Sequence, residues 1–293
     1  MNLYQTRDFG EKINATIQYA VKQIRSLSTA LLYIAGAPAL IAGIASGMAS
    51  ASMLSTQPTG VNPPRMNEWM IRQISSPYYL VAIVFALFIP LLVNLTVYSH
   101  LKVYNRNPGE PITVEAVWAE VQSAFGRAVI TWLMVGVLLI AATLFFLIPG
   151  IYLGVVFSLA LAVVVLEDGS ASTFMGRCFE LIRDHWWSTF GLIIIISFIA
   201  YILSFAFNVP AAGVSMMVAL KLVPSMPVYV TILTSILSTV GSVVVSSLIA
   251  LGIAFQYFNL VELRDGRSIL SAIDSIGSST PPPIPRSSDE GDY

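Results

Sequence analysis

Long runs without a charged residue alternate with short charged segments along this chain of 293 residues. A helix crosses the roughly 30 Å hydrocarbon core of a bilayer with about 17 to 25 mostly apolar residues. Because six such runs occur, the pattern predicts an all-α integral membrane protein with six transmembrane helices. The predicted spans cover residues 29–53, 79–99, 128–148, 150–166, 187–208 and 226–258.

Two charge-free runs are too long for one crossing and must contain a break. As one helix, residues 128–166 would measure about 58 Å at 1.5 Å per residue, nearly twice the thickness of the hydrocarbon core. We expect the break at Pro149 and Gly150, because proline lacks the backbone N–H and glycine tolerates turn geometry. Asn208 and Pro210 are expected to end the fifth span in a similar way.

A short amphipathic helix is predicted before each pair of spans. Apolar residues recur there at helical spacing, and a turn containing glycine precedes each segment. Asp8 and Glu11 fit a capping box at the start of the first helix. We therefore expect three hairpins, each preceded by a cytoplasmic amphipathic helix, as an internal repeat. The three apolar stripes are Ile13, Ile17, Val21 and Ile24; Val114, Val117, Val121 and Phe125; and Phe174, Cys178, Leu181 and His185.

The expected domain organisation has three parts. Residues 1–27 form a cytoplasmic amphipathic N-terminal helix, and residues 28–267 form the six-span membrane domain. Residues 268–293 form a short helix and a disordered tail that is rich in proline and acidic residues, because this segment lacks the apolar residues needed for a core.

Charged residues make up 11% of the chain, against roughly 25% in soluble proteins, and this deficit excludes a soluble protein. The net charge of −1 gives no field that would attract nucleic acid. Of the 15 Lys and Arg residues, all but Arg65, Arg72 and Lys221 lie on one side of the predicted spans. Because cytoplasmic loops are rich in basic residues, we expect both termini in the cytoplasm and the protein in a bacterial inner membrane.

The sequence offers little material for catalysis. One cysteine and two histidines cannot build a disulfide framework, a structural zinc site or a haem site from this chain alone. We therefore expect no metal, no cofactor and no catalytic residue, and a protein that is not an enzyme. Cys178 lies on an apolar stripe and is expected to be buried.

Polar residues inside the predicted spans are candidate functional groups, because a polar side chain in the bilayer is costly. Two explanations stay open: hydrogen bonding between closely packed helices, or a polar path for a substrate. No carboxylate or basic group lies in the middle of a span, which argues against an energised pump. The candidates are Asn94, Asn208, Ser238, Ser242 and Gln256.

The segment before the fifth span is the candidate cytoplasmic interface, because aromatic residues anchor spans at the membrane surface. Carboxylates in this region are expected to cap helices, pair with arginines or face water rather than catalyse. The candidate interface residues are Arg177, Glu180, Arg183, His185, Trp186 and Trp187.

Three segments, Ile148–Tyr152, Val163–Gly169 and Arg177–Trp187, resemble a broad group of bacterial integral membrane proteins. The group includes the membrane domain attached to some glycerophosphoryl diester phosphodiesterases and related uncharacterised membrane proteins. The resemblance covers residues 125–198, about a quarter of the chain. It implies a six-span inner-membrane module. The soluble phosphodiesterase domain is not expected in these 293 residues, so no catalytic residue of the family carries over.

These observations favour a non-enzymatic inner-membrane scaffold or accessory subunit that organises protein partners or lipids through its cytoplasmic amphipathic helices. The expected partners are membrane lipids and either other proteins or further copies of this chain, but no nucleic acid. The first alternative is a transporter or channel for a lipidic or weakly polar solute, which predicts a polar cavity near the middle of the bilayer. The second is a membrane-associated enzyme of phospholipid metabolism, which predicts that Glu167, Asp168 or His185 converge on one point.

Overall fold

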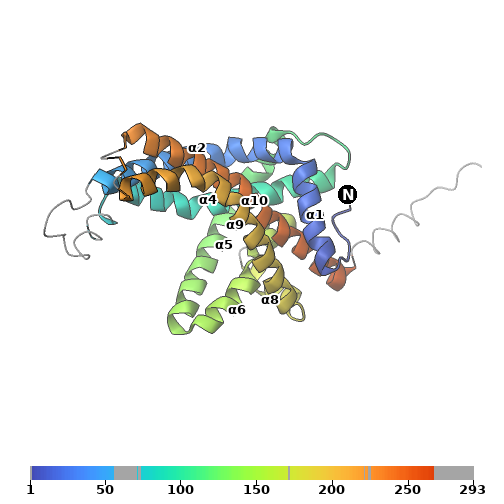
Figure 1. The fold of residues 1–293 in the computed structure, drawn as a ribbon. Coiled ribbons are helices and arrows are strands. Elements are labelled where there is room, and N and C mark those ends of the chain that lie inside the picture. The colour runs from blue at the N-terminus through green and yellow to red at the C-terminus, as the bar shows by residue number, and fades with distance from the viewer. Residues whose placement is uncertain are drawn as a thin grey trace, which may run out of the picture.

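A computed structural model describes residues 2–55, 71, 74–170, 172–220, 222–223 and 226–266. Within these ranges the chain forms nine helices and no strand (Figure 1). The predicted tail at 268–293 and the basic residues Arg65, Arg72 and Lys221 lie outside the described residues. The helices are α1 Phe9–Lys22, α2 Ile24–Ser55, α4 Pro77–Arg106, α5 Val114–Phe145, α6 Leu147–Phe157, α7 Ala160–Leu166, α8 Phe174–Ile182, α9 Trp186–Ala219 and α10 Val228–Asp265.

Five helical stretches are long and apolar enough to cross a membrane: α4, α5, α6 together with α7, α9 and α10. The count rises to six if the two parts of α2, Ile24–Ile34 and Gly36–Ser52, make up one span, although they meet at 64°. Pro38 explains the bend, because it has no N–H to donate to the carbonyl of Ile34. The described part of the chain is therefore all-α, with five or six helices suited to crossing a membrane.

The break between α5 and α6 falls at Phe146, three residues before the predicted position. Phe146 has an extended backbone, with φ −157° and ψ 137°, so it separates the two helices. Pro149 occupies the first turn of α6, where a missing N–H breaks no helical hydrogen bond. A Cβ on Gly150 would lie 2.6 Å from Oγ1 of Thr143, so glycine allows the two arms of the hairpin to approach closely.

The helix α9 continues through both Asn208 and Pro210 and ends at Ala219, beyond the expected end of the fifth span. A proline inside a helix removes one hydrogen bond, and the surrounding residues are apolar enough to keep the helix together.

The three amphipathic segments differ in how they pack. The stripe of α8 faces the core, with Phe174, Cys178 and Leu181 buried. In α5 the stripe and the following span form one continuous helix. In α1, Ala15 and Tyr19 are buried, whereas the predicted apolar stripe lies largely on the exposed side.

The backbones of α2 and α10 approach each other closely. A Cβ added to Gly47 would lie 2.5 Å from Cα of Ile232, and one added to Gly43 would lie 2.8 Å from Cα of Ile236. Small residues let the backbones of membrane helices approach in this way. Other small residues of α2 are also buried, the alanines at positions 35, 39, 42, 45 and 49.

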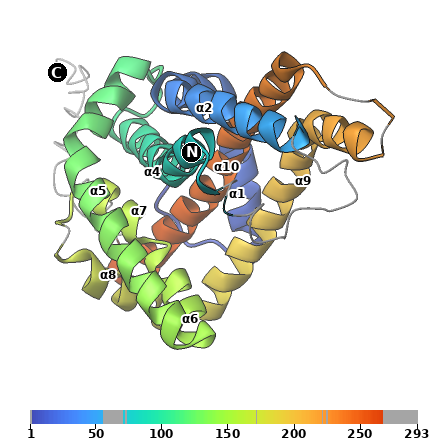
Figure 2. The ribbon, with the colours of Figure 1, turned by 90° about the vertical axis from the view of Figure 1, so that its left-hand side faces the viewer.

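The α5–α6 hairpin diverges from the bundle formed by α2, α4 and α10 (Figure 1). Viewed from the left-hand side of Figure 1, α5 and α9 lie on opposite sides of α4 and α10 (Figure 2). We call the end of the molecule where α4 and α10 end and α8 and α9 begin the polar end, because the described ion pairs gather there.

Candidate functional site

The turn between α7 and α8 connects the charged side chains of the polar end. Asp168 has a φ of 53°, in the left-handed region that Asp adopts more readily than most residues. In this conformation the neighbouring carboxylates Glu167 and Asp168 have different partners. Together they connect the charged residues that we call the ion-pair network. Its members are Lys102, Arg106, Glu120, Arg127, Glu167, Asp168, Arg177, Glu180, Arg264 and Asp265.

Arg177 lies at the centre of one half of the network. Its guanidinium bonds to Glu167 at 3.1 Å and to Glu180 at 3.3 Å, and it also pairs with Asp265 at the end of α10. Burial alone would lower the pKa of Arg177, but hydrogen bonds to Asp265 and Glu167 raise it above the ordinary arginine value. The charge of Arg177 therefore fastens α8 to α10 and to the turn after α7.

Lys102 and Arg127 hold the other half of the network. The Nζ atom of Lys102 lies 2.7 Å from Oδ1 of Asp168 and 3.1 Å from Oε2 of Glu120. Arg127 bonds to the same Oδ1 at 3.1 Å and to the Asp168 carbonyl at 2.6 Å. The hydrogen bond from Lys102 is the main reason why the pKa of Asp168 lies below its ordinary value, and Arg127 adds to this effect. This half joins α4 and α5 to the turn.

The contribution of the network to the stability of the fold depends on how far its side chains are buried. The side chains of Lys102, Glu120, Glu167 and Arg177 are only 12 to 19% exposed. Exposed single pairs contribute little to stability, whereas charges joined in a network contribute more, and the loss of one partner of a shielded pair is costly. The polar end is therefore a connected surface built from five parts of the chain: α4, α5, the turn after α7, α8 and α10.

A second polar group, buried beside the network, joins α1, α2 and α4. The hydroxyl of Tyr19 lies 2.9 Å from Nδ1 of His100, and Nε2 of His100 lies 2.9 Å from Oγ of Ser26. Oγ of Ser26 in turn donates to the carbonyl of Ile112 at 3.3 Å. We assign a single direction of donation, from Tyr19 through a neutral His100 to Ser26, because it satisfies every atom in the chain. Both ring nitrogens of His100 are therefore hydrogen-bonded, one to α1 and one to α2.

The aromatic residues of the predicted interface join α9 to α6. Trp186 stacks on Tyr152 at 5.8 Å and on Phe190 at 5.1 Å, and its indole N–H donates to the carbonyl of Tyr152. Trp187 is 77% exposed and meets Trp186 edge to face at 4.7 Å. Two of the segments named in the sequence analysis, 148–152 and 177–187, thus contact each other here.

The remaining interface candidates stay apart from the network. Arg183 is exposed and forms no ion pair with any residue that the structure describes. His185 is half-buried just before α9, and its carbonyl accepts a hydrogen bond from Thr189. Arg177 and Glu180 are the two predicted interface residues that belong to the network.

The polar candidates of the spans do not gather at one point. Asn94 donates to the carbonyl of Pro90, and Asn208 donates to the carbonyl of Ser204, each within its own helix and at 2.8 Å. Ser238 instead donates to the carbonyl of Phe207 at 3.0 Å and so joins α10 to α9. These bonds lie within or between packed helices. Ser242 is half-buried on α10.

Gln256 joins α10 to α9 in the interior. Its Nε2 donates to Oγ1 of Thr189 at 2.8 Å, while its Oε1 is buried and has no hydrogen-bond partner among the described atoms. The cavity beside these two side chains is too narrow for a water molecule, and the side chain of Ile196 fills the space next to Gly252. This place therefore serves as a helix contact rather than a channel.

In the part of the chain that the structure describes, Glu167, Asp168 and His185 do not converge on one point. Glu167 and Asp168 are engaged in ion pairs, and no hydrogen bond joins either carboxylate to His185 within the described part of the chain. No group of three or more His, Cys, Asp or Glu suited to a metal ion occurs among the described residues. Cys178 is buried, as expected, and burial raises the pKa of its thiol to about 12.

The sequence did not single out several members of the network. Lys102 and Arg127 lie 66 and 41 positions from their partner Asp168 in the turn. Asp265 lies 88 positions from Arg177 in α8, and Tyr257, which bonds to the network, lies 90 positions from Glu167. The one sequence feature that marked the turn at the centre of the network was the Glu167–Asp168 pair followed by a glycine.

No family model, no curated protein and no solved structure matches this chain. The resemblance to the membrane domain of glycerophosphoryl diester phosphodiesterases therefore stays a prediction.

Proposed function

We propose that this protein is a non-enzymatic scaffold of a bacterial inner membrane, with both termini in the cytoplasm. In this proposal it organises lipids, and protein partners held with them, at the cytoplasmic face. The six-span hairpin arrangement and the relation to the phosphodiesterase membrane domain are parts of the same proposal.

The observation that carries the proposal is the ion-pair network. Its charged side chains bond to one another across α4, α5, α8 and α10, which gives the polar end a fixed shape. A fixed surface that exposes Arg183, Trp187 and other side chains suits the docking of lipids or proteins. A catalytic site would instead need carboxylates that are free to take up or release a proton.

The polar groups inside the spans support a scaffold over a transporter. A solute path would require polar groups that face a shared cavity near the middle of the membrane. Asn94 and Asn208 bond to their own helices, and Ser238 and Gln256 bond to α9. These bonds favour a closed bundle, so we place transport of a lipidic or weakly polar solute second and enzymatic activity third.

The orientation can be tested with reporter fusions in bacteria. A reporter that is active only in the cytoplasm should be active when fused after Tyr293 or inserted at Gly109, and a periplasmic reporter should be inactive at both places. The reverse pattern, or different results at the two places, would contradict the proposed topology.

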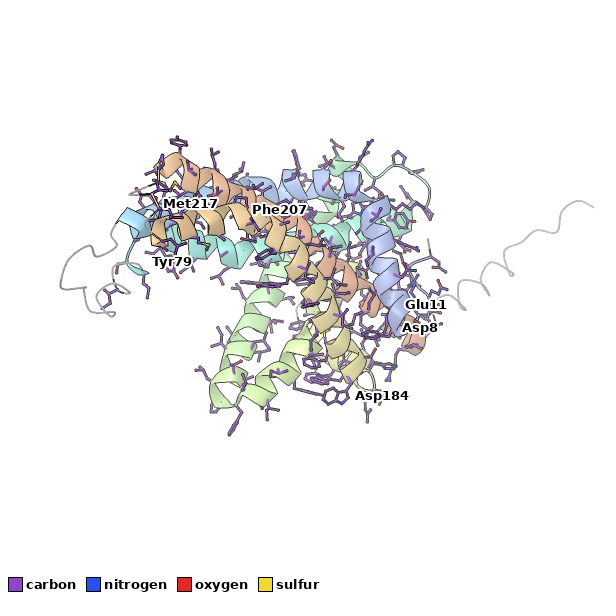
Figure 3. The ribbon with its side chains drawn as sticks, viewed as in Figure 1. Asp8, Glu11, Tyr79, Asp184, Phe207 and Met217 are labelled. Atoms are coloured by element: carbon purple, nitrogen blue, oxygen red, sulfur yellow. The ribbon has the colours of Figure 1, made fainter. Side chains whose placement is uncertain are left out.

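The scaffold role can be tested by purifying the full chain in a mild detergent and identifying lipids and proteins by mass spectrometry. We expect reproducible partners that decrease in the Asp168→Ala variant, which disconnects the network, but not in Asp184→Ala, an exposed aspartate just after α8 (Figure 3). Solute uptake by reconstituted vesicles, or equal recovery of partners from both variants, would count against the proposal.

A further inference from the structure

An apolar groove lies on the side of the molecule where α1, α2 and α9 surround α10. Its volume is about 440 Å³, within the range of roughly 300 to 1,000 Å³ that is typical of ligand pockets. Figure 1 views this side, with α10 passing between α1 and α9. Phe207, labelled in Figure 3, lines the groove from α9, and Val245 lines it from α10.

The chemistry of the groove excludes a polar ligand. Of the fifteen residues that line it, thirteen are apolar and the other two are Ser28 and Ser247. The hydroxyl of Ser28 donates to the carbonyl of Ile24, and that of Ser247 donates to the carbonyl of Val244. Both hydroxyls are thus satisfied within their own helices, so the walls present hydrocarbon and a matching ligand is a hydrocarbon chain.

The groove is open to the surroundings of the molecule. Val21 is 65% exposed, Ile24 is 58% exposed and Leu203 is 46% exposed, although all three line it. Two of its walls, α9 and α10, are suited to crossing a membrane, so the groove faces the acyl chains of the bilayer. The apolar stripe of α1 forms part of the groove, because Ile17 and Val21 are members of the stripe and also line the groove.

Basic residues mark the end of the groove nearest the junction of α1 and α2. Lys22 and Arg25 follow directly after the lining residues Val21 and Ile24 and are exposed. No carboxylate among the residues that the structure describes forms an ion pair with either of them. Two free positive charges at the membrane surface attract anionic headgroups.

We infer that this groove binds one acyl chain of an anionic phospholipid from the surrounding leaflet, with the headgroup next to Lys22 and Arg25. The inference rests on the proposed scaffold function, since it names the lipid that one side of the scaffold holds. It also gives the exposed stripe of α1 a role: the stripe forms a wall of the lipid site.

The test places the full chain in phosphatidylcholine nanodiscs that contain a small share of a photoactivatable lipid with a diazirine on its acyl chain. After illumination, peptide mapping locates the label. We expect photoactivatable phosphatidylglycerol to label peptides covering residues 17–31 and 199–207 about tenfold more than the matching phosphatidylcholine, because of the two nearby positive charges. Equal labelling by the two lipids, or label spread evenly over all spans, would overturn the inference.

Two pairs of variants separate the acyl chain from the headgroup. Ala206→Trp fills the groove and should reduce its labelling by both lipids, whereas Ala212→Trp, at an exposed position of α9 that does not line the groove, should not. Lys22→Gln together with Arg25→Gln should make the two lipids label equally, whereas Arg183→Gln should keep the preference. Labelling unchanged by Ala206→Trp would contradict the inference.

The same experiment distinguishes this inference from the proposed function. If the purified protein retains lipids or proteins elsewhere but the groove is unlabelled, only the inference fails. If crosslinks between two copies map to the groove in place of the lipid label, a second copy occupies it and the inference also fails. If the protein retains neither lipids nor partner proteins, both proposals fail.

Discussion

The hydroxyl of Tyr257 donates a hydrogen bond to Oε1 of Glu167 over 2.8 Å. The donor lies near the end of α10, and the acceptor lies in the turn after α7, 90 positions earlier in the chain. The same oxygen also accepts a hydrogen bond from Nη2 of Arg177 at 3.1 Å. One carboxylate oxygen therefore connects α10 to α8. The polar end thus combines a few shared charged atoms with the buried apolar contacts that α8 and α10 make with the core.

Replacing Tyr257 with phenylalanine should destabilise the protein by about 1 to 3 kcal/mol, because a partly buried hydrogen bond to a charged group is lost while the ring is kept. Unfolding by sodium dodecyl sulfate in mixed micelles, followed by circular dichroism, measures the change. Tyr229→Phe is the matched control, since Tyr229 lies on the same helix and is 65% exposed. Equal stability of the two variants would show that the bond contributes nothing.

Stability should also depend on the protonation of Asp168. Its pKa is lowered chiefly by the hydrogen bond from Lys102, so this carboxylate holds its proton less tightly in the folded protein than in the unfolded chain. Its contribution is complete above the usual Asp pKa of about 3.9 and is lost as the pH falls through the lower folded value.

We therefore expect the free energy of unfolding to decrease as the pH falls below about 5, and expect Asp168→Asn to reduce this slope. Asp184→Asn, at an exposed position without a described ion pair, should leave the slope unchanged. Parallel slopes for the wild type and Asp168→Asn would contradict the assignment.

Cys178 should not react with a water-soluble maleimide while the protein is folded. Its side chain is buried and its pKa is raised to about 12 by burial first and by Glu167 second, so little thiolate forms at pH 8. Labelling should become complete after denaturation. A cysteine introduced by Ser172→Cys, in a Cys178→Ala background, gives the exposed comparison, and rapid labelling of native Cys178 would show that α8 detaches from the bundle.

The contact between α2 and α10 should not tolerate a methyl group at Gly47. Because a Cβ there would lie 2.5 Å from Cα of Ile232, the helices must separate, and overpacking of this kind costs about 1 to 3 kcal/mol. At Gly36 the nearest atom would be 3.9 Å away, on α2 itself. Gly36→Ala should therefore leave stability unchanged or slightly higher. Similar melting temperatures for the two variants would disprove the close packing.

The sequence predicted the features that depend on local composition. The lack of charge along 128–166 predicted a hairpin, and the spacing of Asp8 and Glu11 predicted a capping box, which the structure contains. The position of the break was missed because Pro149 is also compatible with a first helical turn. The burial of Cys178 followed from its place on the stripe.

The contacts of the polar end could not be predicted in the same way. Several of them join residues that are far apart in the chain, such as Lys102 and Asp168, and a single sequence does not say which charges meet. The bonds of Asn94 and Asn208 to carbonyls four residues earlier also leave no trace in the pattern of apolar positions.

The length of α10 has a consequence for where a partner can attach. Its 38 residues extend for about 57 Å, whereas the hydrocarbon core needs roughly 30 Å. In the proposed topology the surplus lies at the end that carries Tyr257 and Asp265, outside the hydrocarbon core, where α1 and α8 pack against α10. A molecule that binds this end of α10 therefore binds a helix that also lines the groove. Because α10 is continuous between Val245 and Asp265, a displacement of its end would be transmitted to the groove.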